Sequence, residues 1–306
     1  MNLSPITQTK LYGLENKFIE LSNLFINNNL PTKIILSGQK GIGKCTLAYH
    51  LINFVLSKYE VNSYDTNNFS INNENKSFKL VLNNSHPNFN LIDVLTDKKQ
   101  IDLTQIKLLI KNLSKSTFTT GPRIILIDNI ELLNRNSINA LLKTLEEPND
   151  NTFFILIHNN KKVLPTLTSR CLNFKISLTN KNSISIFESL IGTEINQKVN
   201  NDLIDYYFTP GNLFNLLLWA QKNKIDLKNI ELREFLSIIL DKDLIKKDLF
   251  LNYIIYNFIE LYLIKKISIK YSKLYSYFIE QFDNTKKFNL NFDVILSEFK
   301  FKVLNG

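Results

Sequence analysis

The chain has 306 residues, 44% of them hydrophobic, a formal net charge of +9 and a pI near 9.2. This length suffices for two or three packed domains, and no segment approaches the roughly 18 uninterrupted apolar residues of a membrane span. The two cysteines, Cys45 and Cys171, exclude a disulfide framework and a four-cysteine zinc site. Together with polar first residues that do not resemble a signal peptide, they lead us to expect a cytoplasmic protein.

Strands and helices alternate through the first half of the chain. Short apolar runs predict strands, and apolar residues at helical spacing predict helices. In chain order we expect a strand over Lys33–Ser37, a helix over Lys44–Leu56, a strand over Phe89–Val94, a helix over Leu103–Leu113, a strand over Arg123–Asp128, a helix over Asn136–Glu147 stopped by Pro148, and strands over Thr152–Ile157 and Leu172–Ile176. This alternation predicts an α/β domain, residues 1–177, with a parallel sheet covered on both faces.

One stretch interrupts this pattern. Eight asparagines fall between Asn62 and Asn84, inclusive, with little patterned hydrophobicity before Phe78. We predict a poorly ordered insertion over about residues 60–84.

The second half of the chain is helical throughout. Helical spacing over Ile184–Leu190, Leu203–Tyr207 and Asn212–Lys222 predicts a small helical domain, residues 178–225. From residue 226 to residue 306, Leu, Ile, Phe and Tyr recur at helical spacing, which predicts a separate all-helical domain.

A phosphate-binding loop follows the first predicted strand. Gly38, Gly41 and Gly43 precede Lys44 at the start of a helix, in the strand–loop–helix order that the P-loop motif requires. The glycines let backbone N–H groups surround a phosphate chain, and the lysine and helix N-terminus add positive charge.

Two substitutions indicate that this pocket hydrolyses nucleotide poorly. The position after Lys44 normally carries a hydroxyl that ligates Mg²⁺, but it is Cys45, a soft ligand, with Thr46 one position too late. Asp128 ends an apolar strand and is suited to hold Mg²⁺, but Asn129 follows it and cannot act as a base. Glu131 lies close in sequence, and we interpret it as an acid at a helix start. ATP and Mg²⁺ binding are therefore expected to be weak.

Three segments resemble a known family. Asp128-Asn129-Ile130-Glu131, the run Asn139–Pro148 (NALLKTLEEP) and the triplet Ser169-Arg170-Cys171 are similar to the bacterial clamp-loader branch of the AAA+ ATPases. The resemblance implies a P-loop AAA+ domain, a helical lid over residues 178–225 and an all-α collar domain over residues 226–306 that joins an oligomeric ring.

Within that family, the departures resemble the non-motor delta-prime type rather than the active gamma/tau type. Cys45 and Asn129 are two of them. Phe214 stands where active members place a nucleotide-contacting lid arginine, and the four-cysteine zinc module is absent, so no zinc is expected. The resemblance implies gamma/tau and delta subunits as partners, with the sliding clamp and primed DNA contacted through the complex.

The same resemblance implies a role for Arg170, with Ser169 beside it. In the family this arginine projects into the neighbouring subunit's ATP site as an arginine finger. The alternative is a loop arginine in a local salt bridge. Cys171 is interpreted as a packing residue. The pair His158-Asn159, after the fourth predicted strand, matches a phosphate-sensing position of the family loosely, and a surface turn is an equal alternative.

Three other functions stay open. An active gamma/tau-type ATPase would require turnover by the isolated chain. A stand-alone P-loop kinase would require a substrate pocket and a base, and would not need the helical C-terminal domain. A DNA-binding module is compatible with the net charge, although the lysine pairs are scattered rather than clustered.

Overall fold

The computed structural model describes residues 4–95, 98–114, 121–147, 151–160, 165–204, 208–241, 244–265, 269–288 and 290–304. The chain forms two compact units, residues 1–179 and 180–306. The boundary lies two residues from the predicted end of the α/β domain. The second unit contains both predicted helical domains, and their division at residue 225 stays a prediction.

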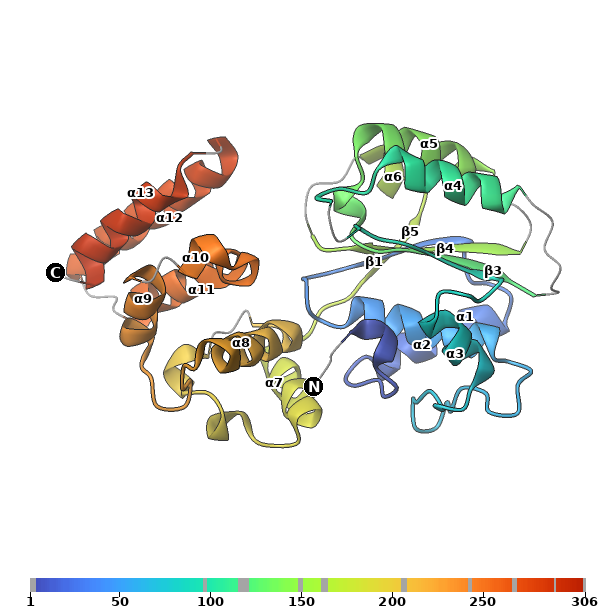
Figure 1. Cartoon of the computed structure of the whole chain (residues 1–306), viewed down its shortest axis with the longest axis horizontal. Coiled ribbons are helices and arrows are strands. Elements are labelled where there is room, and N and C mark those ends of the chain that lie inside the picture. Colours follow the sequence, from blue (N-terminus) through green and yellow to red (C-terminus); the bar gives the residue numbers. More distant parts are fainter. Residues whose placement is uncertain are drawn as a thin grey trace. The chain divides into compact units, whose positions relative to one another are not determined.

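The first unit is built around a five-stranded parallel sheet in the order β2-β3-β4-β1-β5 (Figure 1). The strands are β1 (Lys33–Ser37), β2 (Phe89–Ile92), β3 (Arg123–Ile127), β4 (Thr152–His158) and β5 (Leu172–Lys175). The helices are α1 (Glu15–Ile26), α2 (Lys44–Leu56), α3 (Lys76–Leu82), α4 (Leu103–Leu113), α5 (Arg135–Glu146) and α6 (Pro165–Thr168), with 3-10 turns at Pro5–Thr7 and Ile130–Leu132 (η2). The predicted parallel α/β architecture is confirmed.

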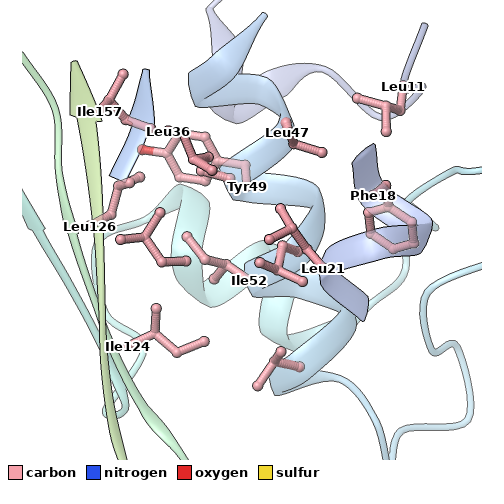
Figure 2. Close-up of a cluster of buried hydrophobic side chains, with 14 of the residues drawn as sticks. Leu11, Phe18, Leu21, Leu36, Leu47, Tyr49, Ile52, Ile124, Leu126 and Ile157 are labelled. Atoms are coloured by element: carbon pink, nitrogen blue, oxygen red, sulfur yellow. The ribbon is translucent and has the colours of Figure 1, made fainter. Parts of the chain in front are cut away.

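Helices cover both faces of this sheet, with α1, α2 and α3 on one side and α4, α5 and α6 on the other (Figure 1). Side chains alternate along each strand, so Ile34 and Leu36 join the core under α1 and α2, whereas Ile35 joins the core under α4 and α5. Figure 2 shows the first core, where Leu36 and Leu126 lie opposite Ile52 of α2. Burial on both faces explains why the strands are continuous apolar runs.

Polar side chains define where several helices begin. Asp102 forms a capping box with Gln105 at the start of α4. Asn134 accepts a hydrogen bond from the backbone N–H of Ser137 at the start of α5. These caps satisfy backbone donors that the first helical turn leaves free. Pro148, the predicted stop of α5, lies outside the described residues.

The prediction of a poorly ordered insertion over residues 60–84 is wrong. Tyr64 stacks on Phe18 of α1 with ring centroids 4.7 Å apart, and its hydroxyl lies 2.9 Å from Nδ1 of the buried His50. Asn75 caps α3, accepts from Nδ2 of Asn53 at 3.0 Å and donates to a backbone carbonyl at 2.6 Å. Single apolar and amide side chains therefore hold this segment through tertiary contacts. Because these residues do not recur at a regular spacing, the sequence shows no periodic pattern there.

The second unit is all helical in its described residues. It comprises α7 (Asn180–Ile191), α8 (Pro210–Asn223), α9 (Leu232–Asp241), α10 (Leu244–Lys247), α11 (Leu249–Lys265), α12 (Ile269–Phe288) and α13 (Phe292–Phe299), with 3-10 turns at Ile195–Gln197 and Asn201–Leu203 and a π-helical turn at Lys300–Leu304. The predicted helix over Leu203–Tyr207 includes residues that the structure does not describe.

Aromatic side chains join the helices of this unit. Phe235 of α9 contacts Trp219 of α8 and Phe258 of α11, with centroid distances of 6.0 and 4.8 Å. At the other end of the chain, Phe278 of α12 contacts Phe299 of α13 at 5.3 Å. Edge-to-face ring pairs have a preferred geometry, so this packing favours one defined arrangement of the helices over non-specific hydrophobic contact.

Candidate functional site

The loop after β1 has the shape of a phosphate cradle. A Cβ atom on Gly38 would lie 2.3 Å from the backbone oxygen of Ile176, so no larger residue fits there. Gly43 has a φ of 92° and forms the N-cap of α2, a conformation that favours glycine. The glycines predicted from the motif therefore bend the backbone into the start of α2, where N–H groups can face an anion.

Lys44 is held by the loop that it follows. Its side chain is buried, and Nζ donates to the carbonyl oxygens of Gly38 at 2.8 Å and Gln39 at 2.6 Å. Burial lowers the pKa of Lys44 to about 8, while the charges of Asp128 and Glu131 act in the opposite direction. The ammonium group thus stays largely protonated at neutral pH and lies near two carboxylates.

Cys45 and Asp128 interact directly at the position where an ATPase would hold Mg²⁺. Burial, followed by the charge of Asp128, raises the pKa of the Cys45 thiol, so the thiol is neutral. Burial and the charge of Asp93 raise the pKa of Asp128 to about 6, and the hydrogen bond from Cys45 opposes that rise. A neutral sulfur is a poor ligand for a hard cation, and Thr46 lies one position further along α2. The loop fits a phosphate group, whereas this ligand set does not fit Mg²⁺.

A hydrogen-bonded network joins the carboxyl ends of β2, β3 and β4. Asn129, in the left-handed region with φ 55°, donates from Nδ2 to Oδ1 of Asp93 at 3.0 Å. Asn159 donates from Nδ2 to Oδ1 of Asn129 and to Oε1 of Glu131, each at 2.9 Å. Asn129 is an amide, so the network offers no base at the position that follows Asp128.

Arg170 lies at the opposite edge of the sheet. It comes two residues before Leu172, which pairs with Ile34 near the amino end of β1. Lys33, at the start of β1, donates to the carbonyl of Leu145, the neighbour of Glu146. Parallel strands rise about 3.3 Å per residue, so this edge is on the order of 15 Å from the P-loop.

The Arg170 side chain is in a local ion pair. Its Nε and Nη2 donate to Oε1 of Glu146 at 3.0 and 2.6 Å, and its Nη1 donates to the carbonyl of Thr166 at 2.9 Å. The side chain keeps 34% of its surface exposed. Ser169 is also exposed and donates its hydroxyl to the Thr166 carbonyl. The guanidinium is therefore ordered yet accessible.

Comparisons with known proteins identify the family. A family profile described as "DNA polymerase III, delta subunit" matches residues 13–180, more than half of the chain. The chain belongs to this family. The match covers the sheet, the P-loop and the segment that carries Arg170.

Relatives named as gamma subunits and relatives named as delta' subunits are both similar to this chain. The chain is 29% identical to DNA polymerase III subunit gamma of Buchnera aphidicola (Schizaphis graminum) over 74% of its length and 62% of the relative. It is 31% identical to subunit delta' of Pseudomonas aeruginosa over 45% of its length and 40% of the relative. It is 25% identical to subunit delta' of the same Buchnera over 70% of its length and 66% of the relative. The chain thus spans less than two thirds of the first two relatives.

Most of the predicted site residues lie together in the structure, and three further side chains join them. The structure brings Gly38, Lys44, Cys45, Asp128 and Asn129 together at one edge, as the motifs predicted. Asn159 belongs to this cluster rather than to a surface turn. Asp93 was predicted to lie inside a strand and was not predicted at the site. Glu131 was predicted at a helix start, where η2 does begin, but its hydrogen bond with Asn159 was not predicted.

Four further observations concern features predicted from the sequence. Cys171 packs against the core under α4 and α5, as expected for a packing residue, and burial raises its pKa to about 11. Phe214 is buried on α8. Within the described ranges, no group of three or more His, Cys, Asp or Glu side chains is arranged to hold a metal ion. In the same part of the chain, no helix is long and apolar enough to cross a bilayer.

Proposed function

We propose that this chain is a non-motor, delta-prime-type subunit of a DNA polymerase III clamp loader that supplies Arg170 in trans to a neighbouring ATPase subunit. The observation that carries the proposal is the separation of Arg170 from the chain's own P-loop. An arginine at the amino edge of the sheet cannot reach a phosphate at the carboxyl edge of the same sheet. Any nucleotide that it serves is therefore bound by another chain.

The chemistry of this role is electrostatic. During phosphoryl transfer, negative charge develops on the oxygens of the transferred group, and a fixed guanidinium stabilises that charge. Arginine suits this role because it stays protonated and presents a planar set of donors. Arg170 combines an ordered guanidinium with an accessible surface.

The chain's own pocket supports a non-motor role. The thiol of Cys45 occupies the Mg²⁺-ligand position and bonds to Asp128. Asn129 is engaged with Asp93 and Asn159, and it has no carboxylate with which to activate water. Nucleotide binding by the phosphate cradle remains compatible with these residues, but they provide neither a hydroxyl ligand for Mg²⁺ at position 45 nor a carboxylate base at position 129.

The proposed partners follow from the relatives and from the division of the chain. Subunits named gamma and delta' are similar to this chain, so we infer assembly with gamma/tau and delta subunits into a ring that acts on a sliding clamp at primed DNA. Residues 178–225 would form the lid, and residues 226–306 the collar helices that join the ring.

The deciding experiment reconstitutes the loader with Arg170→Ala and measures DNA-stimulated ATP hydrolysis. Turnover at the site that Arg170 serves should fall by about 10³-fold. Lys143→Ala removes an exposed cation from the neighbouring helix α5 and should leave turnover unchanged. Unchanged turnover with Arg170→Ala, in a complex that still assembles on gel filtration, would refute the finger.

An active gamma-type ATPase is the second candidate, because the gamma relative aligns over the largest share of this chain among the relatives named above. The isolated chain would then hydrolyse ATP, and Lys44→Ala would abolish that turnover. We expect no turnover above that of Lys44→Ala. A clear difference between the two proteins would favour the gamma-type function.

A further inference from the structure

We propose that Glu146 is a positioning residue that sets the orientation of the Arg170 guanidinium toward a phosphoryl group; this inference rests on the proposed function of Arg170. A single carboxylate oxygen, Oε1 of Glu146, accepts from both Nε and Nη2 of Arg170. Two bonds from one side of the guanidinium fix both its position and the plane of the group. The two residues are 24 positions apart, so only the tertiary structure brings them together.

Both supports of the guanidinium are themselves anchored. Glu146 is the last residue of α5, directly after the buried Leu145, whose carbonyl accepts from Lys33 of β1. Thr166, the second support, lies in α6, where Leu167 is buried in the same core. Arg170 is thus held between two elements that are packed against the sheet, not by a free loop.

The contacts leave part of the guanidinium for a ligand. An arginine has five N–H donors, and the three hydrogen bonds to Glu146 and Thr166 use three of them. One hydrogen on each terminal nitrogen is left over, and Arg170 is one-third exposed. Phosphate oxygens are suited to accept from this pair because their spacing matches a planar fork of donors.

The Glu146–Arg170 ion pair is better explained by the positioning of the guanidinium than by a contribution to folding stability. Both side chains are substantially exposed, and exposed ion pairs contribute little to folding. An unsupported arginine would instead lose several rotamers on meeting a phosphate, and that entropy would weaken the contact. Glu146 removes this freedom beforehand, as preorganised catalytic groups require.

The test uses the complete reconstituted loader and compares Glu146→Ala with Glu146→Gln. Alanine removes the acceptor, and DNA-stimulated turnover at the site served should fall about tenfold with the KM for ATP unchanged. Glutamine keeps a carbonyl oxygen that can accept both bonds, so it should retain turnover within about threefold. Glu147→Ala removes the same charge one residue later and should behave as wild type.

A double variant separates positioning from a general structural effect. If Glu146 acts only through Arg170, Glu146→Ala added to Arg170→Ala should cause no further loss. An additional loss in the double variant would overturn the inference. So would unchanged or faster turnover with Glu146→Ala, or an equal loss with Ala and Gln.

Failure of this inference can be distinguished from failure of the proposed function. If Arg170→Ala lowers turnover but Glu146→Ala does not, the finger stands and only the positioning role is refuted. If Arg170→Ala itself leaves turnover unchanged, the proposed function fails. Melting temperature and assembly of each variant show whether a loss comes from the site or from the fold.

Discussion

The two edges of the sheet differ in how their polar side chains are used. At the carboxyl edge, Lys44, Cys45 and Asn129 all have partners within the chain, and the groups are largely buried. At the amino edge, Arg170 is bound to Glu146 but keeps a third of its surface exposed. From this contrast we propose that the P-loop edge serves mainly the fold, whereas the Arg170 edge serves a partner. Each variant below tests one side of this contrast.

The largest expected effect lies at the P-loop. Gly38→Ala would place a Cβ atom 2.3 Å from the backbone oxygen of Ile176, and backbone cannot move aside cheaply. We expect a loss of about 3 kcal/mol in the free energy of unfolding, measured by urea denaturation. Gly121→Ala is the matched control, because its φ of 141° is similar but its Cβ would meet only a side-chain nitrogen at 3.4 Å. Equal losses would contradict a structural role for the P-loop edge.

The next effect concerns pH. The pKa of Asp128 is raised from 3.8 to about 6 in the folded protein, so between these values the unfolded chain binds fewer protons than the folded chain. Stability from this group is therefore present below about pH 4 and is lost as the pH rises through 6. Asp128→Asn should stabilise the protein at pH 7.5 by about 2 kcal/mol relative to wild type and by little at pH 4.

Because His50 also titrates in this range, the pH dependence of stability has to be compared between Asp128→Asn and wild type. Burial lowers its pKa to about 4, so its contribution to stability rises with pH over the same range and opposes that of Asp128. Subtracting the wild-type curve from the Asp128→Asn curve cancels the His50 contribution. A difference that does not change between pH 4 and pH 7.5 would rule out the raised pKa of Asp128.

A smaller effect, on the Mg²⁺ dependence of ATP binding, is expected when Cys45 is replaced. Cys45→Thr introduces a hydroxyl beside Asp128, and a hard oxygen suits Mg²⁺ better than sulfur does. In calorimetry, Mg²⁺ should strengthen ATP binding by the variant about tenfold, which corresponds to about 1.4 kcal/mol. Cys45→Val has the same shape as threonine without the hydroxyl and should show no such gain. An equally strong Mg²⁺ effect in the wild type would mean that Cys45 does not limit the pocket.

The smallest effect is the contribution of the Arg170–Glu146 pair to stability. A double-mutant cycle with alanine at both positions should give a coupling energy below about 1 kcal/mol, decreasing as salt is added. The pair would then matter for the partner's reaction rather than for folding. A coupling well above that limit would make the amino edge structural and would remove the contrast between the two edges.

Much of the first unit could be predicted from local signals. The strand Lys33–Ser37 and the helices Lys44–Leu56 and Leu103–Leu113 have the predicted bounds. These segments carry either a continuous apolar run or a helical period, and burial on fixed faces produces such patterns. The segment over residues 60–84 was mispredicted because Tyr64 and Asn75 are held singly by α1 and α2, without any period.

The sequence by itself determined the parallel α/β architecture and the P-loop with its missing hydroxyl and base, because each depends on neighbouring residues or on a short repeat. Only the tertiary structure decided that Asp93, Glu131 and Asn159 meet around Asn129, and that Arg170 lies beside Glu146 at the far edge of the sheet. These contacts join the ends of separate strands and helices. Their positions depend on strand order and register, which side-chain spacing along a single segment does not encode.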